Sequence, residues 1–178
     1  MTTFTSRFLF SVIAVACFAA LGFALYAEHF MNLHPCPLCM VQRLAVLVVG
    51  VLALIFAAIN PQKIGRKLAG LTLAFWAFAG AGVSFWHVHL QNLPPNQAPA
   101  CGPGLGFMVD MVKSENLAVG DFLNQLFFTA SGDCTKVDWL FLGGSMPFWT
   151  GLMLSAFGLI ALYITRLKSQ KIRFYHAL

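Results

Sequence analysis

The chain has 178 residues, of which 59% are hydrophobic and only 10% are charged, and its formal net charge is +5. A composition this apolar excludes an ordinary water-soluble domain and indicates a protein of the lipid bilayer. The basic excess does not indicate nucleic-acid binding, because these charges adjoin apolar stretches where they would face anionic lipid.

Four stretches are long and apolar enough to cross about 30 Å of hydrocarbon as helices. They are residues 8–27, 40–59, 68–89 and 146–165. The first is nearer the length of a full span than the ~7–15-residue core of a secretion signal, so we expect it to be retained. Backbone polar groups must be satisfied within a span, which favours helices. The sequence therefore predicts one all-α membrane domain over residues 1–178, built as a four-helix bundle.

The charges predict how this bundle sits in the membrane, since Lys and Arg near span ends stay on the cytoplasmic side. Basic residues gather at Arg7, at residues 63–67 and at residues 166–173, whereas all six acidic residues fall in or beside the other two connections. Both termini are therefore expected in the cytoplasm. Residues 28–39 and 90–145 are then a short and a long exported loop.

The connections differ in character. The inner one, "NPQKIGRK", predicts a tight turn between spans two and three, which would pack as an antiparallel hairpin. The long loop opens with the proline-rich "NLPPNQAPACGPG", which favours extended chain. It continues with "FMVDMVKSENLAVGDFLNQLFF", whose apolar residues recur at roughly helical spacing. We expect one or two short amphipathic helices there, lying on the membrane surface or packed on the bundle.

Of the five cysteines, one lies in a predicted span and four lie in the predicted exported loops. Cys17 lies inside the first span, where a small apolar side chain needs no role beyond packing. The other four fall two to each exported loop: Cys36 and Cys39 in the short one, Cys101 and Cys134 in the long one. An even division on the oxidising side of a membrane indicates disulfide chemistry.

Three other uses of these cysteines fit less well. A four-cysteine zinc site would need a second close pair, but Cys101 and Cys134 are 33 positions apart. Attachment of a c-type haem would need a histidine where Met40 stands. A structural bridge is believable for the long-loop pair. A bridge closing only Cys-Pro-Leu-Cys constrains almost no chain, because stabilisation grows with loop length. The short pair is better explained by redox exchange.

The stretch "HPCPLCMVQR" places this pair at a helix start. Pro37 suits a first helical turn and Pro35 keeps the preceding chain extended, so span two should begin at or near the pair. The positive end of a helix stabilises a thiolate at Cys39. Arg43 follows Cys39 by four residues and shares its helix face. An arginine in the first turns of a span needs a charged or polar partner, or must extend its side chain to the membrane surface. We expect the Arg43 guanidinium to interact with the Cys39 sulfur or with a ligand beside it.

A cysteine pair that oxidises another pair repeatedly must itself be reoxidised. The sequence has neither a dinucleotide-binding glycine motif nor a P-loop, which leaves an acceptor dissolved in the bilayer. A membrane quinone fits, because it is apolar and takes two electrons and two protons. Arg43 is one candidate to contact it, and "FWHVHLQ" supplies His87 and His89. Two residues apart on a helix, these histidines point in different directions, so only one should face the site.

These features together resemble the DsbB family, the quinone-dependent thiol oxidoreductases of the bacterial inner membrane. The resemblance covers nearly the whole chain and is carried by "CPLCMVQR", "HVHLQ", "SGDC" and "WLFLGGSMPFW". It implies reoxidation of a DsbA-like periplasmic thiol oxidase, with ubiquinone or menaquinone as the electron acceptor.

The resemblance also implies roles for single residues. Cys36 and Cys39 match the quinone-coupled pair, with Arg43 and His87 at the quinone. Cys101 and Cys134 match the pair that faces the DsbA-like partner, with Cys101 forming the mixed disulfide. Two alternatives remain: a membrane scaffold whose loop disulfides are purely structural, and a reductase that carries electrons outward from the cytoplasm. The second would need cysteines in the spans or on the inner face, where only Cys17 lies.

Overall fold

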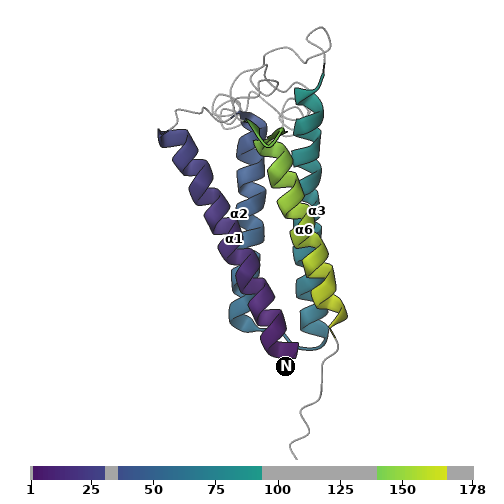
Figure 1. The fold of residues 1–178 in the computed structure, drawn as a ribbon. Coiled ribbons are helices and arrows are strands. Elements are labelled where there is room, and N and C mark those ends of the chain that lie inside the picture. The colour runs from purple at the N-terminus through teal and green to yellow at the C-terminus, as the bar shows by residue number, and fades with distance from the viewer. Residues whose placement is uncertain (1, 31–35, 94–139, 168–178) are drawn as a thin grey trace, which may run out of the picture.

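The structure is a computed structural model that describes residues 2–30, 36–93 and 140–167. Four long helices form its body (Figure 1). They are α1 (Thr2–Phe30), α2 (Pro37–Ile59), α3 (Ile64–Gln91) and α6 (Met146–Arg166). Each is long and apolar enough to cross a membrane. The predicted all-α, four-span membrane fold is confirmed.

The helices reach beyond the predicted spans at most of their ends. α1 begins at Thr2 rather than residue 8, and α2 begins at Pro37 rather than residue 40. Hydropathy marks only the part of a helix that lies in hydrocarbon, whereas the helix continues until a cap or a proline ends it. α6 starts at Met146, as predicted, because its first turn coincides with the start of the apolar run.

A tight turn joins α2 to α3, as predicted. Asn60 ends α2 in the left-handed conformation, with φ 48° and ψ 61°, and its backbone N–H donates to the Phe56 carbonyl. Pro61 follows and cannot continue the helix. α3 begins at Ile64 after Lys63, whose φ is also positive at 50°. The two helices therefore run antiparallel beside each other (Figure 1).

Packing follows chain order. α1 packs on α2, α2 on α3, and α3 on α6, whereas α1 and α6 contact each other only slightly. Toward its C-terminal end α1 leans away from α3 and α6 (Figure 1). The buried core between the helices is apolar and includes Phe10, Ile13, Val49, Leu73, Leu154 and Ile164. Cys17 belongs to it and is fully buried, which confirms its predicted packing role.

Glycines allow the closest helix contacts. A Cβ atom at Gly158 of α6 would lie 2.7 Å from the Phe78 ring of α3, and one at Gly70 would lie 2.6 Å from the Thr165 side chain. Small residues at helix crossings let backbones approach in lipid, where packing drives association. α3 and α6 therefore depend on these glycines for their contact.

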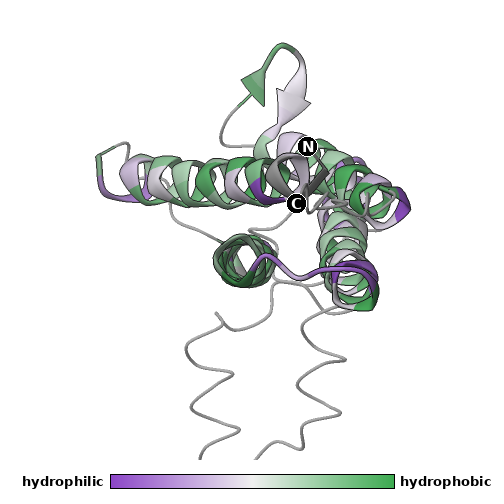
Figure 2. Cartoon of the chain, turned by 90° about the horizontal axis from the view of Figure 1, so that it is seen from below, coloured by the Kyte–Doolittle hydropathy of each residue, from purple (hydrophilic) through white to green (hydrophobic). Residues whose placement is uncertain are grey.

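The outside of the bundle suits lipid. Large apolar side chains are exposed on all four helices, among them Val15 of α1, Leu54 of α2, Phe75 of α3 and Leu159 of α6. Seen from below, the helices are coloured mostly hydrophobic, and the connection between α2 and α3 is hydrophilic (Figure 2). An apolar exterior of this kind is expected where hydrocarbon, not water, surrounds the protein.

A short hairpin precedes α6 and was not predicted. β1 (Leu140–Phe141) pairs antiparallel with β2 (Gly144–Ser145). The two residues between them, Leu142 and Gly143, have φ of 49° and 79°, as a two-residue type I′ turn requires. Strands of two residues carry no alternation that a sequence could reveal. The amphipathic helices predicted for the long loop lie outside the described residues.

The bundle has two distinct ends. The start of α1, the turn between α2 and α3 and the end of α6 lie together at one end (Figure 1). Arg7, Lys63 and Arg166 belong to these segments, and buried Arg66 donates a hydrogen bond to the Leu167 carbonyl, tying α3 to the end of α6. The start of α2, the end of α3 and the hairpin lie at the opposite end (Figure 1). That second end carries the site.

Candidate functional site

The cysteine pair forms the first turn of α2. Cys36 is the N-cap residue, with φ −73° and ψ 164°, and its sulfur accepts a hydrogen bond from the Cys39 backbone N–H at 3.3 Å. Pro37 follows as the first helical residue, where its missing N–H costs nothing. The prediction that span two begins at the pair is confirmed. The sequence places both sulfurs where the helix presents its unpaired N–H groups.

The two sulfurs lie 2.9 Å apart. This separation exceeds the about 2.05 Å of a disulfide bond, so the two sulfurs are not bonded to each other in this structure. Cys36 is buried and Cys39 is half-buried. The positive end of α2 stabilises negative charge on either sulfur. The arrangement can therefore open and close a disulfide with little movement of the backbone.

His87 reaches the pair from α3. Its side chain is fully buried, its Nε2 lies 3.7 Å from the Cys36 sulfur, and its Nδ1 lies 3.0 Å from the Gln42 amide nitrogen of α2. His89 is exposed, and its ring packs against Trp86 with centroids 5.5 Å apart. The two histidines diverge, as their spacing predicts. The structure brings His87, and not His89, to the cysteines.

Apolar side chains surround the pair. Leu38 of α2 and Leu90 of α3 are buried against Cys36, with Val83 and Leu93 packed on this cluster. Water is excluded on this side, and the polar groups that remain interact with one another. A low local dielectric strengthens each of those polar contacts.

Arg43 lies one helical turn below Cys39 but points to α1. Its guanidinium forms an ion pair with the Glu28 carboxylate and donates a second hydrogen bond to the Ala24 carbonyl at 3.2 Å. The predicted need for a partner is thus met by Glu28. Both side chains are partly exposed, at 23% and 28%. This ion pair connects α1 to α2 near the end where α1 leans away.

Sequence reasoning missed two residues of this arrangement. Gln42 is buried three residues after Cys39, and a polar amide in the second turn of a membrane span was a usable signal. Glu28 entered the sequence analysis only as a topology marker. It is the acidic residue nearest in sequence to Arg43, at the end of the adjacent helix, which could have suggested the ion pair.

The other predicted cysteines, Cys101 and Cys134, lie outside the described residues. Their pairing and their distance from Cys36 stay predictions.

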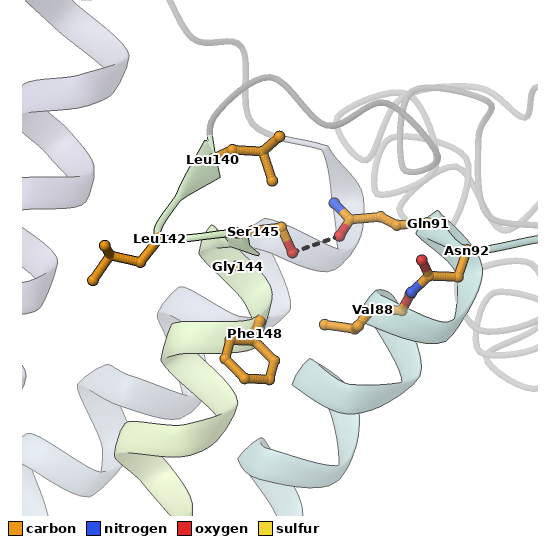
Figure 3. A pocket seen from close by; sticks show the side chains of 9 residues that line it. Val88, Gln91, Asn92, Leu140, Leu142, Gly144, Ser145 and Phe148 are labelled. Carbon is orange, nitrogen blue, oxygen red and sulfur yellow. Dashed lines mark hydrogen bonds between the residues drawn. The ribbon is translucent and has the colours of Figure 1, made fainter.

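A separate pocket of about 270 Å³ opens between α3, the hairpin and the start of α6 (Figure 3). Val88, Gln91 and Asn92 line it from α3, and Phe148 lines it from α6. Ser145 donates a hydrogen bond of 2.7 Å to the Gln91 side-chain oxygen, which fastens the hairpin to α3. The lining contains none of the predicted site residues. This pocket is therefore distinct from the cysteine pair.

Comparison with known proteins agrees with the geometry. The family model described as "Disulfide bond formation protein DsbB" matches residues 6–164. A protein named "Disulfide bond formation protein B" from Chromobacterium violaceum is 42% identical over 148 residues, covering 83% of this chain and 86% of its own. One of the same name from Saccharophagus degradans is also 42% identical, over 86% and 87% of the two chains. A third, from Methylococcus capsulatus, is 39% identical over 91% and 95%.

The match spans α1 to α6 and includes the cysteine pair at the start of α2. The chain is thus a multi-pass membrane protein of bacterial type that takes part in disulfide bond formation. It belongs to the DsbB family of disulfide bond formation proteins.

Proposed function

We propose that this chain reoxidises a DsbA-like thioredoxin-fold oxidase and passes the electrons to a membrane quinone. The observation that carries the proposal is the dithiol pair Cys36 and Cys39, which begins a membrane-spanning helix and has His87 beside it. Such a pair can exchange disulfides at the membrane surface while remaining within reach of a molecule dissolved in the bilayer. Membership of the DsbB family supports disulfide exchange as the class of reaction.

The family resemblance implies an order of exchange between the two cysteine pairs. A thiolate of the reduced partner attacks Cys101 in a Cys101–Cys134 disulfide, and Cys134 leaves as a thiolate. Cys134 then attacks Cys36 in the Cys36–Cys39 disulfide, and Cys39 leaves. The second partner thiol closes the partner's own disulfide and releases Cys101. Cys101 then attacks Cys134, which restores the Cys101–Cys134 disulfide and releases Cys36 as a thiolate. Each step breaks one sulfur–sulfur bond and forms another, so two electrons arrive at the Cys36–Cys39 pair.

The described residues fit a quinone. Leu38 and Leu90 make the surroundings of the pair apolar, and the Arg43 guanidinium, held by Glu28, lies one helical turn from Cys39. When bound, the quinone accepts two electrons and two protons. Cys39, more exposed than Cys36, is the thiolate we place beside it. Arg43 would stabilise the negative charge there, and the Cys36–Cys39 bridge would close again as the electrons depart.

His87 has a defined part in this scheme. If the Gln42 amide nitrogen donates to Nδ1, the ring proton sits on Nε2 and points toward the Cys36 sulfur. A hydrogen bond from Nε2 stabilises Cys36 as a thiolate when Cys134 leaves it. Gln42 would therefore act as a positioning residue through the imidazole.

The same proposal fixes the orientation. The end of the bundle with the basic residues would face the cytoplasm of a bacterial inner membrane, with both termini there. The cysteine end would then face the periplasm, where a DsbA-like partner operates. An alternative, a scaffold with purely structural loop disulfides, gives no reason for two cysteines and a buried histidine to lie together at a helix start.

The test compares Cys39→Ser with Cys17→Ser in the purified protein, given reduced partner and quinone. Cys39→Ser should reduce quinone at less than about one-hundredth of the parental rate, because the variant lacks the thiolate beside the quinone and cannot close the Cys36–Cys39 disulfide. Cys17→Ser replaces a core residue and should keep the parental rate within about twofold. Parental turnover by Cys39→Ser would end the proposal.

A further inference from the structure

We propose that the reduced pair Cys36 and Cys39 binds a thiophilic divalent cation, of which zinc is the physiological example, together with His87. The sulfur atoms of both cysteines and a ring nitrogen of His87 lie within 4.8 Å of one another. This inference does not depend on a quinone or on a partner protein. It adds a binding activity to the dithiol form of the site.

The three donors are of the right chemical kind. Cysteine sulfur and histidine nitrogen are the ligands zinc prefers, and two sulfurs with one nitrogen leave a fourth position for water. The sequence analysis sought the second half of a zinc site among the other cysteines. The structure supplies it from a different helix, as a histidine 48 residues beyond Cys39.

The distances are near those of a metal site. Zinc–sulfur bonds of about 2.3 Å and zinc–nitrogen bonds of about 2.0 Å at tetrahedral angles place sulfur and nitrogen about 3.5 Å apart, and two sulfurs about 3.8 Å apart. The Cys36 sulfur and His87 Nε2 are 3.7 Å apart. The two sulfurs, 2.9 Å apart, must separate by about 0.9 Å. Cys39 is half-buried, so its side chain has room to rotate.

Gln42 provides the support that a ligating histidine requires. A histidine that binds a metal through one nitrogen donates its other N–H to an oxygen nearby. The Gln42 amide lies 3.0 Å from Nδ1. A half-turn of this amide replaces its nitrogen by its oxygen, which accepts the Nδ1–H and leaves the Nε2 lone pair for the cation. The same side chain thus suits both a thiolate and a metal, in two orientations.

The charged side chains near the pair balance each other. Arg43 follows Cys39 by one helical turn, but its positive charge is offset by the Glu28 carboxylate. The cation would carry charge +2, and the two cysteines would each lose a proton and contribute −1. Two protons are released, and no electrons move.

Binding would be specific for one redox state. The disulfide form of the pair has no thiolates to offer, so only the reduced form can hold the cation. A bound cation would in turn occupy both sulfurs and prevent their oxidation. Zinc would therefore hold the pair in its reduced form.

The experiment uses the full chain with Cys101→Ser and Cys134→Ser, so that only the proposed thiols are available near the site. The protein is reduced, freed of reductant and titrated with Cd²⁺, whose thiolate complexes absorb in the near ultraviolet. We expect one cation per chain in the reduced protein and none in the oxidised protein. His87→Ala should weaken binding by about tenfold or more, and Gln42→Leu by about tenfold. His89→Ala, the matched control, should leave affinity unchanged within twofold.

X-ray absorption of the zinc-loaded protein without a histidine substitution gives a second readout that no folding defect can imitate. Two sulfur neighbours and at least one nitrogen neighbour support the proposal. Equal cadmium affinity in His87→Ala and His89→Ala, absence of one-to-one binding, or zinc neighbours without nitrogen would each overturn it. None of these results bears on quinone reduction, so the two proposals are separately testable.

Discussion

Arg43 and Glu28 lie on different helices, and the ion pair between them decides where the guanidinium can act. The carboxylate and the Ala24 carbonyl hold Arg43 on its α1 side. If Arg43 stabilises charge at the quinone, Glu28 contributes by fixing its position. Glu28 then has no effect of its own once Arg43 is gone.

A double-mutant cycle tests whether Glu28 affects quinone binding only through Arg43. Arg43→Leu should raise the KM for quinone by about tenfold, since it removes a charge-assisted contact. Glu28→Gln should raise it by about two- to fivefold, because a partly exposed ion pair contributes only about 0.2–1 kcal/mol. The double variant should match Arg43→Leu alone. Steady-state kinetics at varied quinone concentration measures all three, and strictly additive losses would show that Glu28 acts independently of Arg43.

At the residue scale, the sequence predicted the site residues that lie together on one helix and missed the contacts between residues of two helices. Cys36, Cys39 and Arg43 are neighbours on α2, so their spacing placed them at its start. The divergence of His87 and His89 followed from helix geometry, but the choice of His87 depended on family resemblance. Gln42 and Glu28 were missed because their partners are on α3 and α1. Which faces of two helices meet is set by tertiary packing, which spacing along one chain segment does not contain.

At the scale of the helices, the close contact between α3 and α6 should be weakened by a larger residue at Gly158. Gly158→Ala places a Cβ atom 2.7 Å from the Phe78 ring of α3, so this ring would have to shift away from α6. Overpacking of this kind costs about 1–3 kcal/mol. Gly82→Ala is the matched control, since a Cβ there meets nothing within 4 Å.

Thermal unfolding in detergent should therefore show a lower midpoint for Gly158→Ala. The midpoint of Gly82→Ala should be unchanged or higher, because alanine favours helix over glycine by up to about 1 kcal/mol. Equal midpoints for the two variants would mean that the helices separate easily at this crossing.

The elements were predictable to the extent that hydropathy defines them. All four spans were found, and most of their ends were extended in the structure, as at the start of α2, where Cys36 is the N-cap; the other end of α2, at Ile59, lies where it was predicted. A polar or reactive residue at a helix end carries no hydropathy signal, so the predicted boundaries were short. The hairpin before α6 was missed because strands of two residues show no alternation of polar and apolar residues. Only the turn, with positive φ at Leu142 and Gly143, distinguishes this segment.

For the whole molecule, the charge pattern predicts the membrane orientation. Lys63 and Leu142 are exposed at opposite ends of the bundle. In a background without other cysteines, Leu142→Cys should react with a membrane-impermeant thiol reagent in intact spheroplasts. Lys63→Cys should react only after the membrane is permeabilised. The reverse pattern would contradict the proposed orientation and place the dithiol in the cytoplasm.

The overall architecture was the most predictable level. A chain this apolar has few ways to satisfy its backbone in lipid, so four helices and their antiparallel order follow from composition and length. The relation between the two cysteine pairs did not follow in the same way. Cys101 and Cys134 belong to residues 94–139, outside the described part, and no periodicity connects them to Cys36.

The central claim is that a dithiol at the start of α2 delivers two electrons to a quinone. The direct test mixes the purified full chain with excess reduced DsbA-like partner and either ubiquinone or menaquinone, and counts both products. We predict one quinol for each disulfide formed in the partner, with many turnovers per chain. Partner oxidation that stops after the chain's own disulfides are consumed, with no quinol formed from either quinone, would contradict the account.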